Sequence, residues 1–170
     1  MKMRAIVLMA AIFAVSPALY AQEPVVGVKD PESLFKDPDP VLNKNKQAAL
    51  HIQRELLQCG QWDRAGEWLT KAYHQHNPNA ASGLDGVITF FTKVLKVKRI
   101  DKCDKLTTEI VAVMADDNYV TVLTPRKFPD PRTPGKEYYT SWFDTWRFVD
   151  GKADEHWDPA TITAPPAGGK

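Results

Sequence analysis

The sequence has few cysteines and almost no net charge. Only two of its 170 residues are cysteine, and no cysteine–histidine cluster has the spacing of a zinc site. The 22 basic and 21 acidic residues leave a formal net charge of +1. Binding to nucleic acid or to an anionic membrane surface is therefore not expected.

Long apolar runs are also scarce. The one clear example, Ala5 to Val15, follows the basic residues Lys2 and Arg4 and ends before Ser16. A stable membrane anchor needs about 20 apolar residues, so this run is too short to be one. The pattern is typical of a signal peptide over residues 1–21, with a mature chain that begins near Gln22. We therefore expect a periplasmic or secreted protein without a membrane anchor after cleavage.

The two cysteines, Cys59 and Cys103, leave two alternatives open. In an oxidising compartment an even pair can form a disulfide bond. Two free buried thiols are the other alternative.

Composition divides the mature chain into three parts. Residues 22–42 hold four prolines among acidic residues and lysines, which predicts a flexible linker outside the core. Residues 43–160 are expected to form one folded domain. Residues 161–170 predict a disordered tail.

Within the domain, a helical half precedes a stranded half. Apolar residues recur at helical spacing in three stretches. The first contains Ala49, Ile52 and Leu56 and ends at Gly60. Asp63 can cap the second, and Ser82 is the expected cap of the third. From Thr108 the apolar period changes to two, with a turn at 116–118, an irregular loop at 125–135 and strands at 138–149 and 152–158. Three helices followed by an antiparallel sheet predict an α+β fold.

The dipeptide Asp150-Gly151 is the strongest hairpin signal in the chain. A regular two-residue turn pairs Val149 with Lys152 and continues to Asp144 opposite Trp157. Directly opposed residues share one face of the sheet. This register predicts a core face comprising Trp142, Asp144, Trp146, Phe148, Ala153, Glu155 and Trp157. It predicts an outer face comprising Phe143, Thr145, Arg147, Val149, Asp154, His156 and Asp158, with an Arg147–Asp154 ion pair.

The register places Asp144 among indole rings. Burial would raise the pKa of this carboxyl group toward a range useful for acid–base chemistry. The alternative is a structural Asp144 that accepts a hydrogen bond from a tryptophan N–H or a buried hydroxyl. Glu155 is either a second pocket acid or a residue at the rim of the sheet.

Two segments carry a family resemblance: Tyr73 to Pro78 reads YHQHNP, and Trp142 to Asp158 reads WFDTWRFVDGKADEHWD. Together they resemble the SnoaL-like family of the nuclear-transport-factor-2-like superfamily. The resemblance spans roughly 43–158 and implies a cone, in which three N-terminal helices pack on a curved antiparallel sheet around an apolar pocket.

In the family's polyketide cyclases, a strand aspartate acts as acid and base in an aldol closure without metal or cofactor. Asp144 occupies the matching position, and His76 and Asn77 match a polar segment that can enter the pocket. We therefore expect Asp144 and His76 to be catalytic, with no metal or cofactor. The expected substrate-binding residues are Tyr73, Asn77, Trp142, Trp146, Glu155 and Trp157. A structural alternative for His76 is to fix the loop before Pro78.

These observations favour a proton-transfer enzyme of the cyclase or isomerase type that acts on a small apolar carbonyl compound. The alternative is a periplasmic domain that binds a small ligand without chemistry. An exposed sheet face would also suit a homodimer. Fold alone does not decide between these functions.

Overall fold

A computed structural model describes residues 23–162 of the chain. The expected signal peptide lies outside the described residues, and so does the expected tail from residue 163 onward. Among the residues described, no helix is long and apolar enough to cross a membrane.

The helices precede most of the strands, as the sequence predicts. Helix α1 (Pro40–His51) continues directly into the π-helix η3 (Ile52–Gln58). Two short helices follow, η4 (Trp62–Arg64) and α2 (Ala65–Trp68). Helix α3 (Leu84–Thr89) runs into a second π-helix, η5 (Phe90–Val94).

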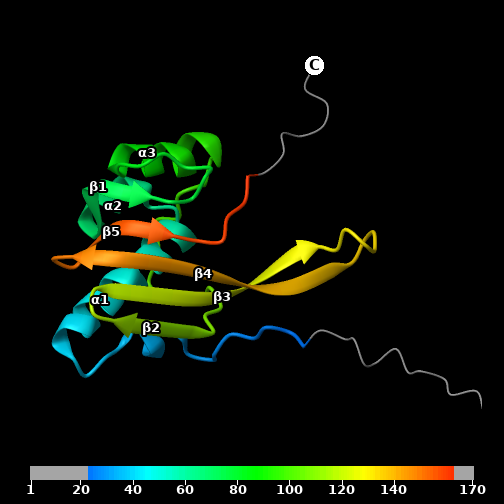
Figure 1. Ribbon diagram of the computed structural model, residues 1–170, viewed down its shortest axis with the longest axis horizontal. Coiled ribbons are helices and arrows are strands. Elements are labelled where there is room, and N and C mark those ends of the chain that lie inside the picture. The colour runs from blue at the N-terminus through cyan, green and yellow to red at the C-terminus, as the bar shows by residue number, and fades with distance from the viewer. Residues whose placement is uncertain (1–22, 163–170) are drawn as a thin grey trace, which may run out of the picture.

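Within residues 23–162, five strands form one sheet in the order β1-β5-β4-β3-β2 (Figure 1). Their bounds are β1 Leu69–Gln75, β2 Ala112–Asp116, β3 Tyr119–Pro129, β4 Glu137–Val149 and β5 Lys152–Trp157. Strand β1 runs parallel to β5, and every other pair is antiparallel. The far ends of β3 and β4 extend beyond the rest of the sheet as a two-stranded arm.

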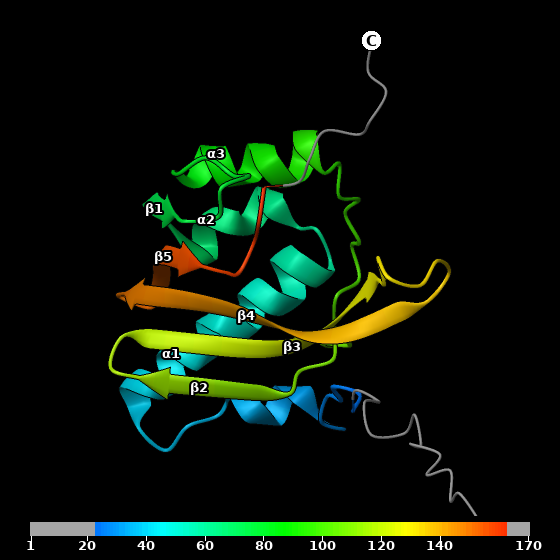
Figure 2. The ribbon, with the colours of Figure 1, turned by 45° about the vertical axis from the view of Figure 1, so that its right-hand side comes forward.

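The helices cover one face of the sheet, which we call the inner face (Figure 2). Ala49, Ile52 and Leu56, the expected apolar stripe of the first helix, are buried there. From the strands Val120, Val122, Trp146 and Phe148 complete the core. This α+β arrangement confirms the predicted fold class.

The segment before the first long helix differs from the expected linker. A 3-10 helix, η2 (Pro31–Phe35), forms within it, and Phe35 is fully buried in the core. Gln47 donates a hydrogen bond from Nε2 to the Phe35 carbonyl oxygen (2.9 Å), and Asp39 caps α1 by accepting from the Val41 and Leu42 amides. Proline content alone predicts a linker. It gives no information about Phe35, the one aromatic residue that anchors this segment in the core.

Three other features differ from the sequence-based expectation. The second helical stretch ends at Trp68, and Leu69–Gln75 forms the edge strand β1. The expected loop at 125–135 is shorter, since β3 continues to Pro129. Ser82 does not cap α3, because Gly83 occupies the N-cap and the Ser82 hydroxyl accepts the Gln75 amide.

The hairpin turn is confirmed at Asp150 and Gly151, whose φ angles are +52° and +81°. Positive φ at both central residues is the requirement of the tight turn that suits twisted strands. Val149 pairs with Lys152 and Phe148 with Ala153, as expected.

Beyond Ala153 the expected register is wrong. Arg147 pairs with Glu155 and Trp146 with His156, so Asp154 is an extra residue that forms a β-bulge. The guanidinium group of Arg147 binds both acids, Asp154 at 2.6 Å and Glu155 at 2.9 Å. One arginine opposite two consecutive carboxylates therefore displaces every later residue of β5 by one position.

Cys59 and Cys103 form a disulfide bond with a Cα–Cα distance of 6.2 Å. The bond joins the end of η3 to the segment that precedes β2. Gly60 follows with φ +64°, and a side chain there would lie 2.6 Å from the Lys98 carbonyl oxygen. The disulfide and this close approach hold the segment around 98–103 against the end of the helix.

Replacing both cysteines with serine should destabilise the protein. The bond spans 44 residues, a loop whose closure restricts the unfolded chain by about 4 kcal/mol in the chain-entropy model. We expect urea unfolding to show a loss of about 2–4 kcal/mol. Wild-type protein unfolded under reducing conditions should match the variant, and equal stability of the oxidised wild type and the variant would contradict the assignment.

Candidate functional site

A pocket of about 440 Å³ lies between the inner face of the sheet and the helices. Its wall includes both π-helical segments, strand residues of β1, β3, β4 and β5, and the short helix η4. The core face of the strands supplies the polar groups Asp144 and His156. Segments of π-helix occur frequently at functional sites.

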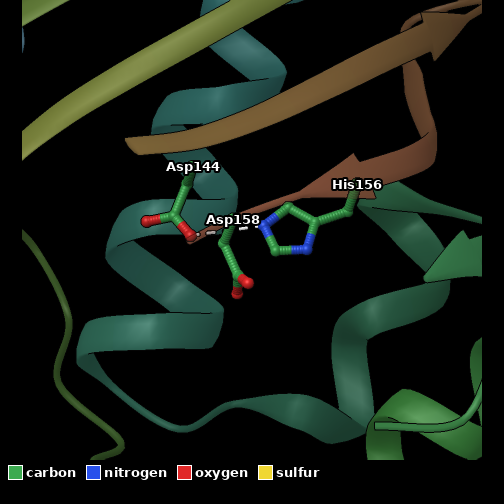
Figure 3. Close-up of side chains that lie close together, drawn as sticks. All are labelled: Asp144, His156 and Asp158. Atoms are coloured by element: carbon green, nitrogen blue, oxygen red, sulfur yellow. Dashed lines mark hydrogen bonds and ion pairs between the residues drawn. The ribbon is translucent and has the colours of Figure 1, made fainter. Parts of the chain in front are cut away.

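Asp144 and His156 are in direct contact in this pocket (Figure 3). Asp144 Oδ1 lies 3.2 Å from His156 Nε2, and the exposed fraction of each side chain is 8%. Asp144 projects from β4 and His156 from the end of β5. The expected inward position of Asp144 is confirmed, whereas the outward position expected for His156 is wrong because of the bulge at Asp154.

Gln75 determines which nitrogen of His156 carries a proton. Gln75 Oε1 accepts the backbone N–H of Asn77 (3.0 Å), so this atom is the amide oxygen. The same oxygen lies 2.8 Å from His156 Nδ1. Because the oxygen is only an acceptor here, Nδ1 must be the donor. In a neutral ring the lone pair then belongs to Nε2, the nitrogen that faces Asp144.

One proton must therefore lie between Asp144 and His156. A carboxylate oxygen facing an unprotonated ring nitrogen would leave two buried acceptors in contact. The proton resolves this, either as a carboxylate beside an imidazolium or as a carboxylic acid beside a neutral imidazole. The indole N–H of Trp142 donates to the same Oδ1 at 3.3 Å. The arrangement is a buried pair joined by one proton.

Asp158 extends the cluster on the same side of the pocket. Its Oδ2 accepts from Asn77 Nδ2 at 2.7 Å, and its Oδ1 accepts the Ala160 amide at 3.0 Å. Ligand atoms of Asp144, His156 and Asp158 all lie within 4.8 Å of one another, so the three could together hold a metal ion. A shared proton satisfies Asp144 and His156 without one.

The aromatic residues Tyr73, Trp142 and Trp146 line the pocket, where the sequence placed them. Trp146 donates from Nε1 to the Tyr73 hydroxyl at 3.2 Å. Burial raises the pKa of Tyr73 well above its ordinary value, so its side chain stays a neutral hydroxyl. Asn77 also lies in the wall, but its amide nitrogen is engaged by Asp158.

Three other candidates lie outside the pocket, contrary to expectation. The bulge turns Glu155 and Trp157 to the outer face, where His76 stacks on Trp157 at 5.0 Å and lies 2.8 Å from Glu155. Hydrogen bonds from His76 and Arg147 lower the pKa of Glu155. Glu155 is thus an ionised partner in a surface network and not a pocket acid.

Sequence reasoning missed three residues of the site: Gln75, His156 and Asp158. Alternation along a regular β5 assigned His156 and Asp158 to the outer face, and Gln75 lay in a segment not expected to form a strand. A usable signal was the pair Asp154-Glu155 opposite the single Arg147, because two acids facing one arginine favour a bulge.

Residues 53–156 match the family model of the SnoaL-like domain. A candidate polyketide cyclase from Acidithiobacillus ferrooxidans has 18% identity and a TM-score of 0.50, with 68% of this chain and 86% of that chain covered. A candidate SnoaL-like polyketide cyclase from Jannaschia sp. CCS1 has 19% identity and a TM-score of 0.50, with 73% and 91% covered. At these identities the likeness concerns the fold. The search of curated proteins found no match.

Replacing Gln75 with leucine should remove the hydrogen bond that fixes the tautomer of His156. The buried Nδ1–H then has no acceptor, which costs about 1–3 kcal/mol of folding free energy. Long-range ¹H–¹⁵N NMR should show a change in the protonated nitrogen of His156. Gln75→Glu keeps an acceptor oxygen and should preserve the Nδ1–H form. An unchanged His156 spectrum in the leucine variant would contradict the assigned tautomer.

Proposed function

Because the chain belongs to the SnoaL-like family, we propose that it is a cofactor-free enzyme that moves a proton next to the carbonyl group of a small apolar compound. The observation that carries this proposal is the buried Asp144–His156 pair, which holds one proton at the wall of a pocket. The aromatic walls and the volume of about 440 Å³ suit a small apolar substrate.

Removal of a proton from the carbon beside the carbonyl group requires a base close to that carbon. Trp142 and His156 both contact Oδ1 of Asp144, and among the described residues no hydrogen bond falls on Oδ2. With the shared proton on His156, Oδ2 removes a proton from the carbon beside the carbonyl group. The electrons of the broken C–H bond form the enolate, and Asp144 becomes a carboxylic acid. In an isomerisation this proton returns to carbon at a second position, and in an aldol closure it goes to the alkoxide oxygen that the new C–C bond leaves. The imidazolium of His156 stabilises the Asp144 carboxylate before the proton is taken and after it is returned.

Replacing Asp144 with asparagine tests this role. The side chain keeps its shape but no longer takes a proton, so the rate should fall by about 10²–10⁴. The fold should persist, because the asparagine amide oxygen can still accept from Trp142 Nε1 and from a protonated His156 Nε2. The assay is exchange of hydrogen for deuterium at the carbon beside the carbonyl group in 1-indanone and 1-tetralone, followed by NMR in D₂O.

Two histidine variants provide a matched comparison. His156→Gln should lose exchange, whereas His76→Gln, on the outer face, should retain it. Exchange should also survive dialysis against a chelator, and its loss would show that the Asp144–His156–Asp158 cluster works through a metal. A lower melting temperature of Asp144→Asn with unchanged exchange would show that Asp144 is structural and not the base. No exchange in the wild type would favour binding without chemistry.

We also propose that the protein is exported, as its first 21 residues suggest. The disulfide between Cys59 and Cys103 supports this proposal, because such bonds persist in oxidising compartments. Expressed in a Gram-negative host, the mature chain should be recovered from the periplasm or medium. N-terminal sequencing should begin near Gln22, and full-length protein retained in the cytoplasm would contradict export.

A further inference from the structure

Arg126 differs from the other arginines in the described part of the chain. Each of the others forms a salt bridge with an acidic side chain: Arg54, Arg64, Arg99, Arg132 and Arg147. Arg126 is exposed and forms no salt bridge within residues 23–162. Among those residues it is also the only lysine or arginine in the wall of the pocket. The pocket therefore carries one positive charge to which no acidic residue of this part of the chain is bound.

The position of Arg126 follows from the register of the sheet. Trp142 pairs with Thr124, two residues before Arg126 on β3, so Arg126 and Trp142 are diagonal neighbours on the inner face. The guanidinium carbon Cζ lies 5.0 Å from the centroid of the Trp142 ring, which is a cation–π contact. This contact positions the positive charge without neutralising it.

Trp142 connects this charge to the polar end of the pocket. Its indole N–H donates to Asp144 Oδ1 at 3.3 Å, and Arg126 lies over its ring. The positive charge and the proposed base are therefore one indole ring apart. Asp158 lies beside Asp144, since their ligand atoms are within 4.8 Å of each other. An anionic group in the pocket is repelled by ionised aspartates and attracted to Arg126, so it takes the Arg126 end.

We propose that Arg126 binds a carboxylate group of the ligand while the carbonyl end of the ligand lies beside Asp144. The planar fork of a guanidinium group matches a carboxylate in shape. One arginine also matches the single charge of a carboxylate better than the nearly double charge of a phosphate monoester. The ligand is then a carbonyl compound with an apolar ring between its carbonyl and carboxylate groups. This inference rests on the proposed function for the carbonyl end, but it concerns binding, which can be measured without turnover.

Two ligands of the same shape test the charge. In 1-indanone-5-carboxylate the carboxylate lies across the ring from the carbonyl group, and 1-indanone-5-carboxamide is its neutral counterpart. In ligand-observed NMR titrations the carboxylate should bind about 5- to 20-fold more tightly than the amide. Arg126→Gln should remove this preference, and Arg126→Lys should keep part of it, because lysine retains the charge without the planar fork. Added salt should reduce the preference of the wild type.

Lys127 provides a control of equal charge. It is the next residue of β3, so its side chain lies on the other face, where its Nζ is 5.0 Å from the centroid of the Tyr139 ring. Lys127→Gln removes the same charge from the same strand and should keep the preference for the carboxylate. Both glutamine variants should melt close to the wild type, because substitutions of exposed side chains cost little stability. A merely structural Arg126 would not distinguish the carboxylate from the amide.

Several results would overturn the subsite. They are equal binding of the carboxylate and the amide, no binding of either ligand, a preference that survives in Arg126→Gln, and an equal loss of preference in Lys127→Gln. A preference that depends on Arg126, without hydrogen exchange in any ketone, would leave the subsite standing and remove the proposed function. Exchange in 1-indanone without that preference would do the reverse.

Discussion

The contact between Arg147 and two successive acidic residues of β5 determines which side chains of β5 face the pocket. A guanidinium group presents several donors in one plane and can bind two carboxylates at once. Asp154 and Glu155 both bind this guanidinium group on the outer face. They can do so because β5 bulges at Asp154, opposite Arg147. Because side chains alternate along a strand, the extra residue moves His156 from the outer to the inner face. An exposed ion network thereby selects the residue that faces Asp144.

The contribution of this network is geometric more than energetic. Ion pairs near the surface individually add little stability, since water and salt screen them. Here Asp154 is also bound by Thr70 of β1 at 2.7 Å, so the bulge ties the edge strand to β5. That strand places Gln75 beside His156. Weak contacts on one face thus set the register, and the register sets the hydrogen bonds of the buried face.

The sequence predicts the elements whose cause is local. Asp150-Gly151 forms the expected turn, and Asp144 faces the core because its position depends on alternation along β4 alone. The face on which His156 lies depends on the contacts of Asp154 and Glu155 with Arg147 across the hairpin. The alternation of apolar and polar residues gives no information about such a contact. Strand β1 was missed because Leu69–Gln75 is mostly polar and forms a strand only when β5 is present to pair with it. Phe35 likewise enters the core through long-range packing that a proline-rich sequence does not reveal.

The polar groups of the pocket differ in how fully the protein satisfies them. Asp144, His156 and Asp158 are tied into hydrogen bonds with Trp142, Gln75 and Asn77, which fixes their geometry before a ligand arrives. The buried polar atoms of Gln53, Trp62 and Thr124 have no hydrogen-bond partner within residues 23–162, a state that costs folding free energy. The Asp144–His156 pair is different, because its partners are in place on both sides. Groups that are fixed before a charge changes need not reorganise when it does, and this is the advantage of a preorganised site over water. In the proposed function, this fixed pair is the part of the pocket that takes up the substrate proton.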